Sequence, residues 1–217
     1  MLKINHIGLI PDGNRRWADE NSLDYSSAYN ISMNNIAKFI QYVSQIGINS
    51  LSIYMLSKEN LNRKRDDIDA VLEAETRFVR TILPTLINKT KYSMIHVGDK
   101  STLPEELRKA LKDVLPQSSQ LSKKRLYLLI GYNPIDEINY AISSKSSKFK
   151  IENLWVPEKV DIVIRTAGGP TLLSNFLPLQ CGYAQIYMIE KYFNDFTKED
   201  FNSILYNASR SNMAYGK

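Results

Sequence analysis

The sequence predicts an α/β fold in which a mostly parallel, twisted sheet is flanked by helices. Short apolar runs alternate along the chain with longer segments whose apolar residues recur every three or four positions, as in strands that alternate with amphipathic helices. The 217 residues are 43% hydrophobic and 24% charged, which is the composition of a globular protein of single-domain size. No repeat, linker or low-complexity tract interrupts this pattern, so we expect one domain over residues 1–217.

The first half of the chain supplies two strands and two long helices. Ile4–Pro11 is a short apolar run, which predicts a strand. Ser26–Ile46 carries apolar residues at three- and four-residue spacing, which predicts a helix, and Asn49–Leu56 is the next apolar run. The same spacing predicts a helix over Asp66–Leu83, whose first turn is acidic and therefore complements the helix dipole. Glu75 interrupts the apolar stripe of this helix, and we expect it at an exposed edge.

The second half of the chain continues the alternation. Tyr92–Gly98 predicts a strand, and Pro104 opens a helix at its first turn, where a residue without an N–H is tolerated. Arg125–Tyr132 is a continuous apolar run typical of a buried strand, and Pro134–Ser143 is expected to be helical. Two strands and a last helix follow: Asp161–Arg165, Tyr183–Ile189 and Lys198–Ser209. Strands that alternate with helices at this spacing form βαβ units, which is why the sheet is expected to be mostly parallel.

The composition excludes several classes of protein. The net charge of +5, from 28 Lys+Arg and 23 Asp+Glu, is too small to predict a nucleic-acid partner. Cys181 is the single cysteine and His6 and His96 are the two histidines, which excludes a disulfide framework, a Cys-rich zinc site and a His cluster. The first residues are too few and too polar for a signal peptide, and no apolar run approaches about 18 residues. We therefore expect a cytoplasmic protein with no integral membrane segment.

Three polar segments come directly after predicted strands: Asp12–Trp17, Ser57–Arg63 and Arg165–Ser174. In open α/β sheets, ligands bind beyond the carboxyl ends of the strands, so we expect these segments to share one crevice. Neither a Gly-x-x-x-x-Gly-Lys nor a Gly-x-Gly-x-x-Gly pattern occurs, and nucleotide binding is therefore not predicted.

The first of these segments has the composition of an anion site. Backbone N–H groups at a strand-to-helix turn can cradle an anion, and Arg15 or Arg16 can bind a phosphate through two hydrogen bonds. Asp12 can hold Mg²⁺ against a diphosphate, because Mg²⁺ takes one or two protein carboxylates together with phosphate oxygens. The alternative is a capped turn, in which Asp12 accepts backbone hydrogen bonds and both arginines are solvated. The other two segments add further groups suited to an anion, which favours phosphate chemistry: Ser57, Asn60, Arg63, Arg165, Gly168, Gly169, Ser174 and Asn175.

The same segments resemble the signatures of the cis-prenyltransferase (undecaprenyl diphosphate synthase) family. His6–Trp17, with the sequence HIGLIPDGNRRW, resembles the first signature, and Ser57–Arg63, SKENLNR, resembles the Ser-x-Glu-Asn-x-x-Arg element. Three further stretches resemble the C-terminal signature: DIVIRTAGG from Asp161, LSNF from Leu173 and AQIY from Ala184. The order is that of the family, and the matches span nearly the whole chain.

The resemblance implies both a fold and an activity. The fold is a twisted parallel sheet with a hydrophobic tunnel between helices, in a homodimer. The activity is the Mg²⁺-dependent extension of an allylic prenyl diphosphate by isopentenyl diphosphate. Asp12 would bind the metal and the diphosphate, and Asn14, Asn60 and Arg63 would take part in ionisation.

The resemblance also implies a set of substrate-binding residues. They are Gly13, Arg15, Arg16, Trp17, Ser57, Arg165 and Ser174. Of these, Arg165 and Ser174 would bind the second diphosphate. Tyr25 and Tyr29 lie near the strand ends and are further candidates for substrate binding, because aromatic rings that line a pocket can stabilise a carbocation by cation–π contacts. For either residue taken alone, ordinary core packing is the favoured interpretation.

Several positions depart from the family pattern, mainly in the isopentenyl diphosphate site. Where the family has Gly-Gly-Glu-x-Arg-x-Ser-Asn-Phe, Gly169 is followed here by Pro170–Leu173, so an acid and an arginine are missing. The metal-binding glutamate of Ala-Glu-x-Tyr is Gln185, and the Arg-Arg-x-Gly of the tail is Met213–Gly216. These losses predict an enzyme that ionises an allylic diphosphate and uses an unusual acceptor.

Four functions stay open at this point. The favoured one is a short-chain or irregular coupling, as in lavandulyl-type members, with a second allylic diphosphate as acceptor. A terpene synthase, in which an internal alkene or water traps the cation, is the first alternative, and a regular cis-polyprenyl diphosphate synthase is the second. A non-catalytic partner subunit ranks last, because such partners usually lose the Asp-Gly-Asn motif that is intact at 12–14.

Overall fold

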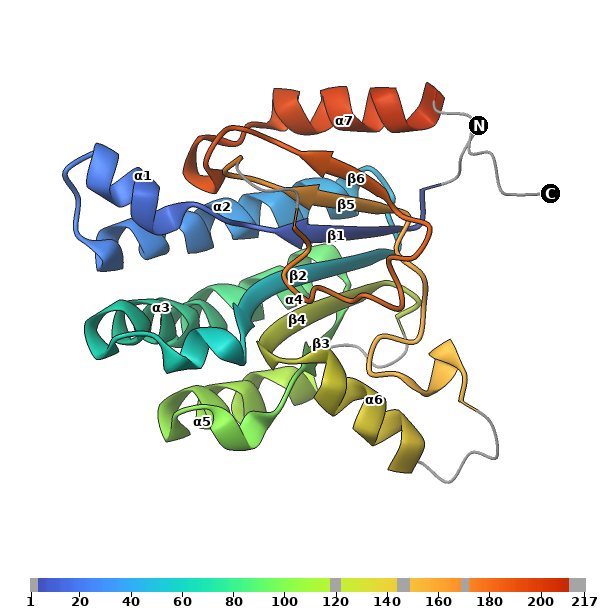
Figure 1. Ribbon diagram of the computed structural model, residues 1–217, viewed down its shortest axis with the longest axis horizontal. Helices are drawn as coiled ribbons and strands as arrows, with labels where there is room; N and C mark the ends of the chain where they lie inside the picture. The colour runs from blue at the N-terminus through green and yellow to red at the C-terminus, as the bar shows by residue number, and fades with distance from the viewer. Residues whose placement is uncertain (1–3, 118–121, 144–148, 169–171, 211–217) are drawn as a thin grey trace.

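A computed structural model of the chain describes residues 4–117, 122–143, 149–168 and 172–210. The described residues form a six-stranded sheet in the order β3-β4-β2-β1-β5-β6, in which every neighbouring pair of strands is parallel. Figure 1 shows the twisted sheet between the helices, with β6 at one edge and β3 at the other. The predicted α/β fold class is therefore confirmed.

The bounds of the elements follow the predicted order. The strands are β1 (His6–Ile10), β2 (Ser50–Ser57), β3 (Ser93–Val97), β4 (Arg125–Tyr132), β5 (Ile162–Arg165) and β6 (Gln185–Met188). The α-helices are α1 (Asn14–Glu20), α2 (Tyr25–Gln45), α3 (Arg65–Arg77), α4 (Leu83–Thr90), α5 (Glu105–Val114), α6 (Pro134–Ser143) and α7 (Lys198–Arg210). Short helical turns lie at Glu59–Asn62, Phe78–Ile82, Lys100–Thr102, Leu115–Gln117, Ile151–Asn153 and Phe193–Asp195.

The helix predicted over Asp66–Leu83 differs from the structure in its second half. α3 ends at Arg77, and a π-helical turn over Phe78–Ile82 leads directly into α4. Pro84 lies in the first turn of α4. Proline has no N–H to continue the helical hydrogen-bond ladder, so the wider turn in front of it accommodates the missing bond.

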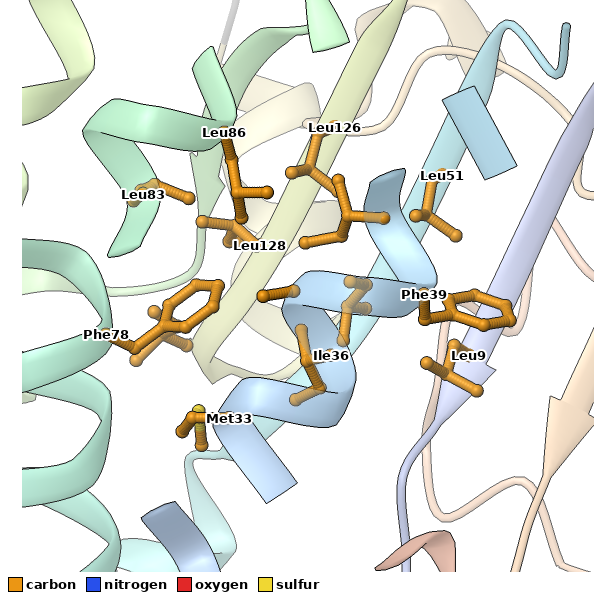
Figure 2. Close-up of a cluster of buried hydrophobic side chains, with 14 of the residues drawn as sticks. Leu9, Met33, Ile36, Phe39, Leu51, Phe78, Leu83, Leu86, Leu126 and Leu128 are labelled. Carbon is orange, nitrogen blue, oxygen red and sulfur yellow. The ribbon is translucent and has the colours of Figure 1, made fainter. Parts of the chain in front are cut away.

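One core fills the space between the sheet and helices α2, α3, α4, α5 and α7. Figure 2 shows part of this core. Met33 and Ile36 of α2, Phe78 of the turn after α3, and Leu128 of β4 lie in the same cluster. Burial of such side chains stabilises the fold by about 1.5–3 kcal/mol each. This core fixes α2 and α3 against β1 and β2, whose ends carry two of the predicted site segments.

A second core lies on the opposite face of the sheet. Alternate strand residues point into it, among them Tyr54 of β2 and Val163 of β5, and residues from the 154–181 region cover it. Phe176 packs so closely there that a Cβ on Gly8 of β1 would lie 2.5 Å from its ring. The glycine in β1 thus lets the 172–177 region, which carries Ser174, approach the sheet.

Candidate active site

A cavity of about 430 Å³ opens at the carboxyl ends of β1, β2 and β5. Because all the strands are parallel, these ends lie at one edge of the sheet, as expected. Nearly all the predicted site residues line the cavity: Asp12, Gly13, Asn14, Arg15, Arg16, Tyr25, Tyr29, Ser57, Asn60, Arg63, Arg165 and Ser174. The structure therefore brings the three polar segments together, while the roles of the individual residues stay predictions.

Gly13 shapes the turn between β1 and α1. Its φ of 99° lies in the left-handed region, and a Cβ there would lie 2.5 Å from both Ala167 Cβ and Tyr192 Cδ1. The carboxylate of Asp12 accepts the N–H of Gly13 at 2.6 Å. Only glycine combines this backbone angle with so close an approach of two neighbouring segments.

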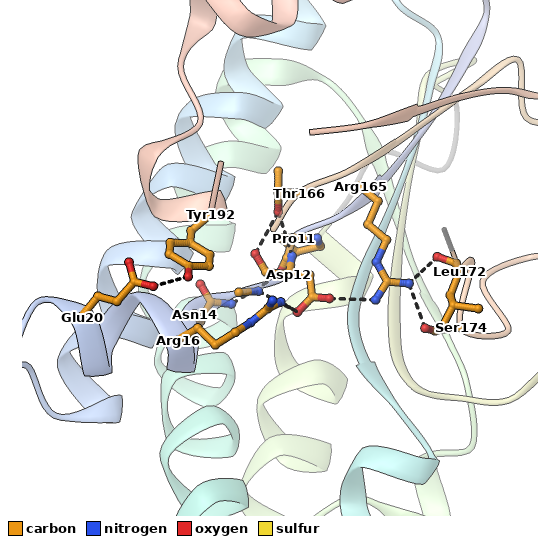
Figure 3. A network of polar contacts seen from close by, with 11 residues as sticks. Pro11, Asp12, Asn14, Arg16, Glu20, Arg165, Thr166, Leu172, Ser174 and Tyr192 are labelled. Atoms are coloured by element: carbon orange, nitrogen blue, oxygen red, sulfur yellow. Dashed lines mark hydrogen bonds and ion pairs between the residues drawn. The ribbon is translucent and has the colours of Figure 1, made fainter. Parts of the chain in front are cut away.

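Asp12 is held from both its backbone and its side chain. Thr166 Oγ1 accepts the N–H of Asp12 at 3.0 Å and donates to its carbonyl oxygen at 2.9 Å. Arg165 donates to Asp12 Oδ2 at 2.8 Å, and the N–H of Phe193 donates to the Asp12 carbonyl at 3.1 Å. Figure 3 shows the contacts of Asp12 with Thr166 and Arg165, which hold the carboxylate in the cavity lining.

Arg165 connects the first and third polar segments. Besides Asp12, its guanidinium donates to Ser174 Oγ at 2.9 Å and to the carbonyl oxygen of Leu172 (Figure 3). Tyr54 holds the same loop through a hydrogen bond from its hydroxyl to the Ser174 carbonyl at 3.1 Å. The guanidinium is therefore positioned by protein groups; Gly169, Pro170 and Thr171, where the family pattern is lost, lie outside the described residues.

The charges in the cavity favour an anion. Its lining contains four guanidinium groups and two carboxylates, those of Asp12 and Asp19. Arg15 is paired with Asp67 at 2.6 Å, and Arg16 lies 3.7 Å from Asp12 Oδ1. Arg63 forms no ion pair within the described part of the chain. Burial, followed by the nearby positive charge of Arg15, lowers the pKa of Arg63, as expected of a cation that lacks its counter-ion.

Two amides and a hydroxyl complete the polar end of the cavity. Asn14 donates through Nδ2 to the Pro11 carbonyl at 3.2 Å, while its buried Oδ1 has no protein partner in the described structure. Ser57 Oγ accepts the N–H of Asn60 at 3.1 Å, which closes the turn after β2. All three residues, Asn14, Ser57 and Asn60, belong to the cavity lining.

The donor set fits Mg²⁺ only if a phosphate ligand supplies most of the oxygens. Among the described residues, no group of three or more His, Cys, Asp or Glu side chains could hold a metal. Asp12 is 36% exposed, and Mg²⁺ bound to a diphosphate needs one or two protein carboxylates. Gln185, at the position of the family's metal-binding glutamate, lies outside the cavity lining, and its Oε1 accepts the Tyr187 hydroxyl at 2.8 Å.

The cavity lining also contains apolar side chains. They are those of Met55 and Leu56 of β2 and Val71 of α3, and Tyr29 of α2 lines the same cavity. Burial raises the pKa of the Tyr29 hydroxyl, which therefore stays protonated. The hydrophobic tunnel that the resemblance implies stays a prediction.

Trp17 is the predicted site residue that the cavity lining does not include. Its indole N–H donates to Asp195 Oδ1 at 2.8 Å, so α1 is tied to the turn at Phe193–Asp195. Thr166 and Asp67 were not among the predicted site residues, although Thr166 belongs to the quoted Arg-Thr pair. Nothing in the local sequence of Asp67 indicates its contact with Arg15, because 52 residues separate them.

The expectation for Glu75 is wrong. Its side chain is fully buried, and neither carboxylate oxygen has a hydrogen-bond partner in the described structure. Burial raises its pKa from 4.5 to about 8. The reason is its position four residues after Val71 and three before Phe78, which turns it to the inner face of the helix.

Comparison with known proteins places the whole chain in one family. The model of the family described as "Putative undecaprenyl diphosphate synthase" matches residues 10–216. An isoprenyl transferase of Campylobacter jejuni is 30% identical, with all of both chains covered. A tritrans,polycis-undecaprenyl-diphosphate synthase (geranylgeranyl-diphosphate specific) of Pyrobaculum aerophilum is 29% identical over 98% of this chain and 95% of its own.

Two solved structures share the fold. The crystal structure of lavandulyl diphosphate synthase from Lavandula x intermedia, in complex with dimethylallyl diphosphate, has a TM-score of 0.87 at 27% identity and covers 98% of each chain. A probable undecaprenyl diphosphate synthase from Campylobacter jejuni has a TM-score of 0.82 at 27% identity, with both chains fully covered. In the described residues, no helix is both long and apolar enough to cross a membrane.

Proposed function

Because this chain belongs to the undecaprenyl diphosphate synthase family of prenyltransferases, we propose that it ionises a short allylic prenyl diphosphate and transfers the prenyl group to an acceptor other than isopentenyl diphosphate. The observation that carries the first half is a cavity whose lining combines four guanidinium groups and Asp12 with the apolar side chains of Met55, Leu56 and Val71. That arrangement matches a diphosphate joined to a small hydrocarbon tail.

The residues of the cavity suit the ionisation step. When the allylic C–O bond breaks, the electron pair leaves with the diphosphate, and preorganised cations and N–H donors stabilise the charge that develops. Arg63, which has no ion pair in the described structure, and the turn at Gly13 would act in this way. Mg²⁺, held by Asp12 together with the diphosphate, would supply Lewis-acid stabilisation of the leaving group.

Two observations support the unusual acceptor. Arg165, which the family resemblance assigns to the second diphosphate, uses its donors on Asp12, Ser174 and the Leu172 carbonyl. Gln185 replaces the metal-binding glutamate by an uncharged amide outside the cavity. In the coupling, the π electrons of a second allylic diphosphate form the new C–C bond to the ionised carbon, and the resulting cation then loses a proton. A solved structure that is similar to this chain, with a TM-score of 0.87, is that of a lavandulyl diphosphate synthase, which supports the proposal.

The test is incubation of the purified protein with Mg²⁺ and dimethylallyl, geranyl or farnesyl diphosphate, each with and without isopentenyl diphosphate. We expect a coupled product from allylic diphosphate alone. Cyclic hydrocarbons or alcohols from one substrate molecule would instead identify a terpene synthase. Regular cis-polyprenyl products that require isopentenyl diphosphate would refute the proposed acceptor. Omission of Mg²⁺ with added chelator should abolish turnover.

We also propose that the chain forms a homodimer through the β6 edge of the sheet. Among the strands that the structure describes, β6 has a neighbour on one side only, and Ile186 in it is 44% exposed. Leu179 and Tyr183, which precede β6, are 42% and 68% exposed. An open strand edge next to exposed apolar side chains favours association with a second copy.

A further inference from the structure

Two buried glutamates, Glu137 and Glu75, differ in their hydrogen bonding. Glu137 accepts hydrogen bonds from the Tyr132 hydroxyl at 2.6 Å, the Val156 N–H at 3.0 Å and Gln180 Nε2 at 3.1 Å. Glu75 is fully buried, and neither of its oxygens has a partner in the described structure. A buried polar group without a partner destabilises a protein, so each such group calls for an explanation.

Glu75 itself does not line the cavity, but it follows a residue that does. Val71, one helical turn earlier on the same face of α3, lines the cavity, and Phe78 follows Glu75 into the core. Tyr29 lines the same cavity from α2; burial is the main cause of the raised pKa of its hydroxyl, and the charge of Glu75 adds to it. The Tyr29 hydroxyl forms no hydrogen bond to another described residue.

Near Val71 the fold therefore places two polar groups that have no hydrogen-bond partner among the described residues. The Tyr29 hydroxyl belongs to a residue of the cavity lining, and the Glu75 carboxyl lies one helical turn beyond that lining. A pocket that takes only a hydrocarbon tail gains nothing from a carboxyl group at its end. Since burial raises the pKa of Glu75 to about 8, the group is a neutral acid at neutral pH and both donates and accepts a hydrogen bond. A hydroxyl group has the same two capacities and is complementary to it.

We propose that Tyr29 and Glu75 form a polar end to the prenyl pocket and select an allylic diphosphate that carries a hydroxyl at the end remote from the diphosphate. The inference rests on the proposed function, which places the diphosphate at Asp12 and the tail against Val71. A site built to bind a substrate hydroxyl rejects the analogue that lacks it, because its own buried polar groups are then left unpaired.

The test compares substrates in pairs. Dimethylallyl diphosphate is measured against the analogue in which one terminal methyl is a hydroxymethyl, and geranyl diphosphate against its terminal hydroxymethyl analogue. We expect kcat/KM of the wild-type protein to favour the hydroxylated member of at least one pair by about tenfold or more. If only one of the two pairs shows the preference, the length of its hydrocarbon tail indicates the distance from Asp12 to the polar end.

Three variants separate binding of the hydroxyl from general effects on the fold. Glu75→Leu should bring the ratio of the two kcat/KM values near one, while Glu75→Gln, which keeps a donor and an acceptor, should retain part of the preference. Glu73→Leu is the matched control, because Glu73 lies on the same helix with its side chain 64% exposed, and the ratio should not change. Thermal melting checks that each variant is folded.

Equal or better use of the unsubstituted substrates by the wild-type protein would overturn the inference and leave the proposed function standing. A hydroxyl preference that persists in Glu75→Leu would also overturn it. If no allylic diphosphate is turned over, the proposed function fails. Calorimetric binding of the non-ionising thiolodiphosphate analogues of each pair then decides the inference alone: selective binding of the hydroxylated analogue supports it, and equal or absent binding overturns it.

Discussion

Asp12 is the residue on which most of the site geometry converges. Its carbonyl accepts from Thr166 and Phe193, and its carboxylate accepts from Gly13 and Arg165. The side chain is only partly buried, so its removal leaves the core intact. This separation of chemistry from packing makes it a clean position for mutation.

We expect Asp12→Asn to lower kcat by about a hundredfold or more, because the amide keeps the shape of the side chain and removes the charge that holds a metal and orients Arg165. Turnover of an allylic diphosphate and the melting temperature are measured together. A near wild-type rate would exclude Asp12 as the metal residue. If the chain were a non-catalytic partner subunit, neither the wild-type protein nor the variant would turn over the substrate.

Glu75 makes the stability of the protein depend on pH. Its pKa is about 8 in the folded protein and near 4.5 when the chain is unfolded, so the folded state binds the proton more tightly. The contribution of this group to the free energy of unfolding is greatest below about pH 4.5. It decreases as the pH rises from there towards and through 8. Tyr29 of α2, whose pKa the charge of Glu75 helps to raise, stays protonated over this range.

We expect Glu75→Gln to remove this dependence. In the wild-type protein, the free energy of unfolding should fall by up to about 4 kcal/mol between pH 5 and pH 9 through this group. The variant should lose that part of the slope while staying folded. Urea unfolding at a series of pH values measures both proteins, and identical slopes would show that Glu75 has solvent or a charged partner in solution.

The turn between β1 and α1 is the element on which the proposed diphosphate site depends. Gly13 combines a φ of 99° with contacts to Ala167 and Tyr192 that exclude a Cβ. Gly47, after α2, has a similar φ of 85°, but a Cβ there would meet nothing within 4 Å. The two glycines therefore separate the cost of the backbone angle from the cost of the close approach.

We expect Gly13→Ala to raise KM for the allylic diphosphate at least tenfold, because the loop must shift away from Ala167 and Tyr192 and its N–H groups lose their alignment. Gly47→Ala should lower stability by about 1 kcal/mol through the backbone angle alone and leave KM unchanged. Steady-state kinetics and thermal melting on both variants measure this contrast. Equal effects on KM would mean that the proposed diphosphate site does not depend on the turn.

At the level of the whole molecule, the proposed homodimer depends on the edge of the sheet at β6. Ile186→Lys should convert the proposed dimer to a monomer, because it places a charge at the centre of the exposed apolar edge. Ile46→Lys, at the C-terminal end of α2 with 39% exposure, is the control and should leave the mass unchanged. Light scattering after size-exclusion chromatography gives the mass of each; a monomeric wild-type protein would contradict the proposal.

Much of this fold was predictable because the patterns that specify it are local. Alternating apolar runs and helical spacing located all six strands and the long helices, and the parallel order follows from their alternation. The π-helical turn before Pro84 was not predictable in the same way, since proline is tolerated in a first turn and the chain continues helical beyond it. Local sequence preferences predict that a helix forms more reliably than they predict the residue at which it ends.

The candidate site was also predictable only in part. Which groups suit a diphosphate was readable from Asp12, Arg63 and their neighbours, because the chemistry of a side chain does not depend on its fold. Tertiary structure alone determined that Arg165 binds Asp12 across 153 residues and that Trp17 turns to Asp195 instead of the cavity. It also determined that Glu75 is buried with no hydrogen-bond partner among the described residues. Pairing and burial are set by distances between residues far apart in the chain, and those distances exist only once the sheet has brought its strand ends together.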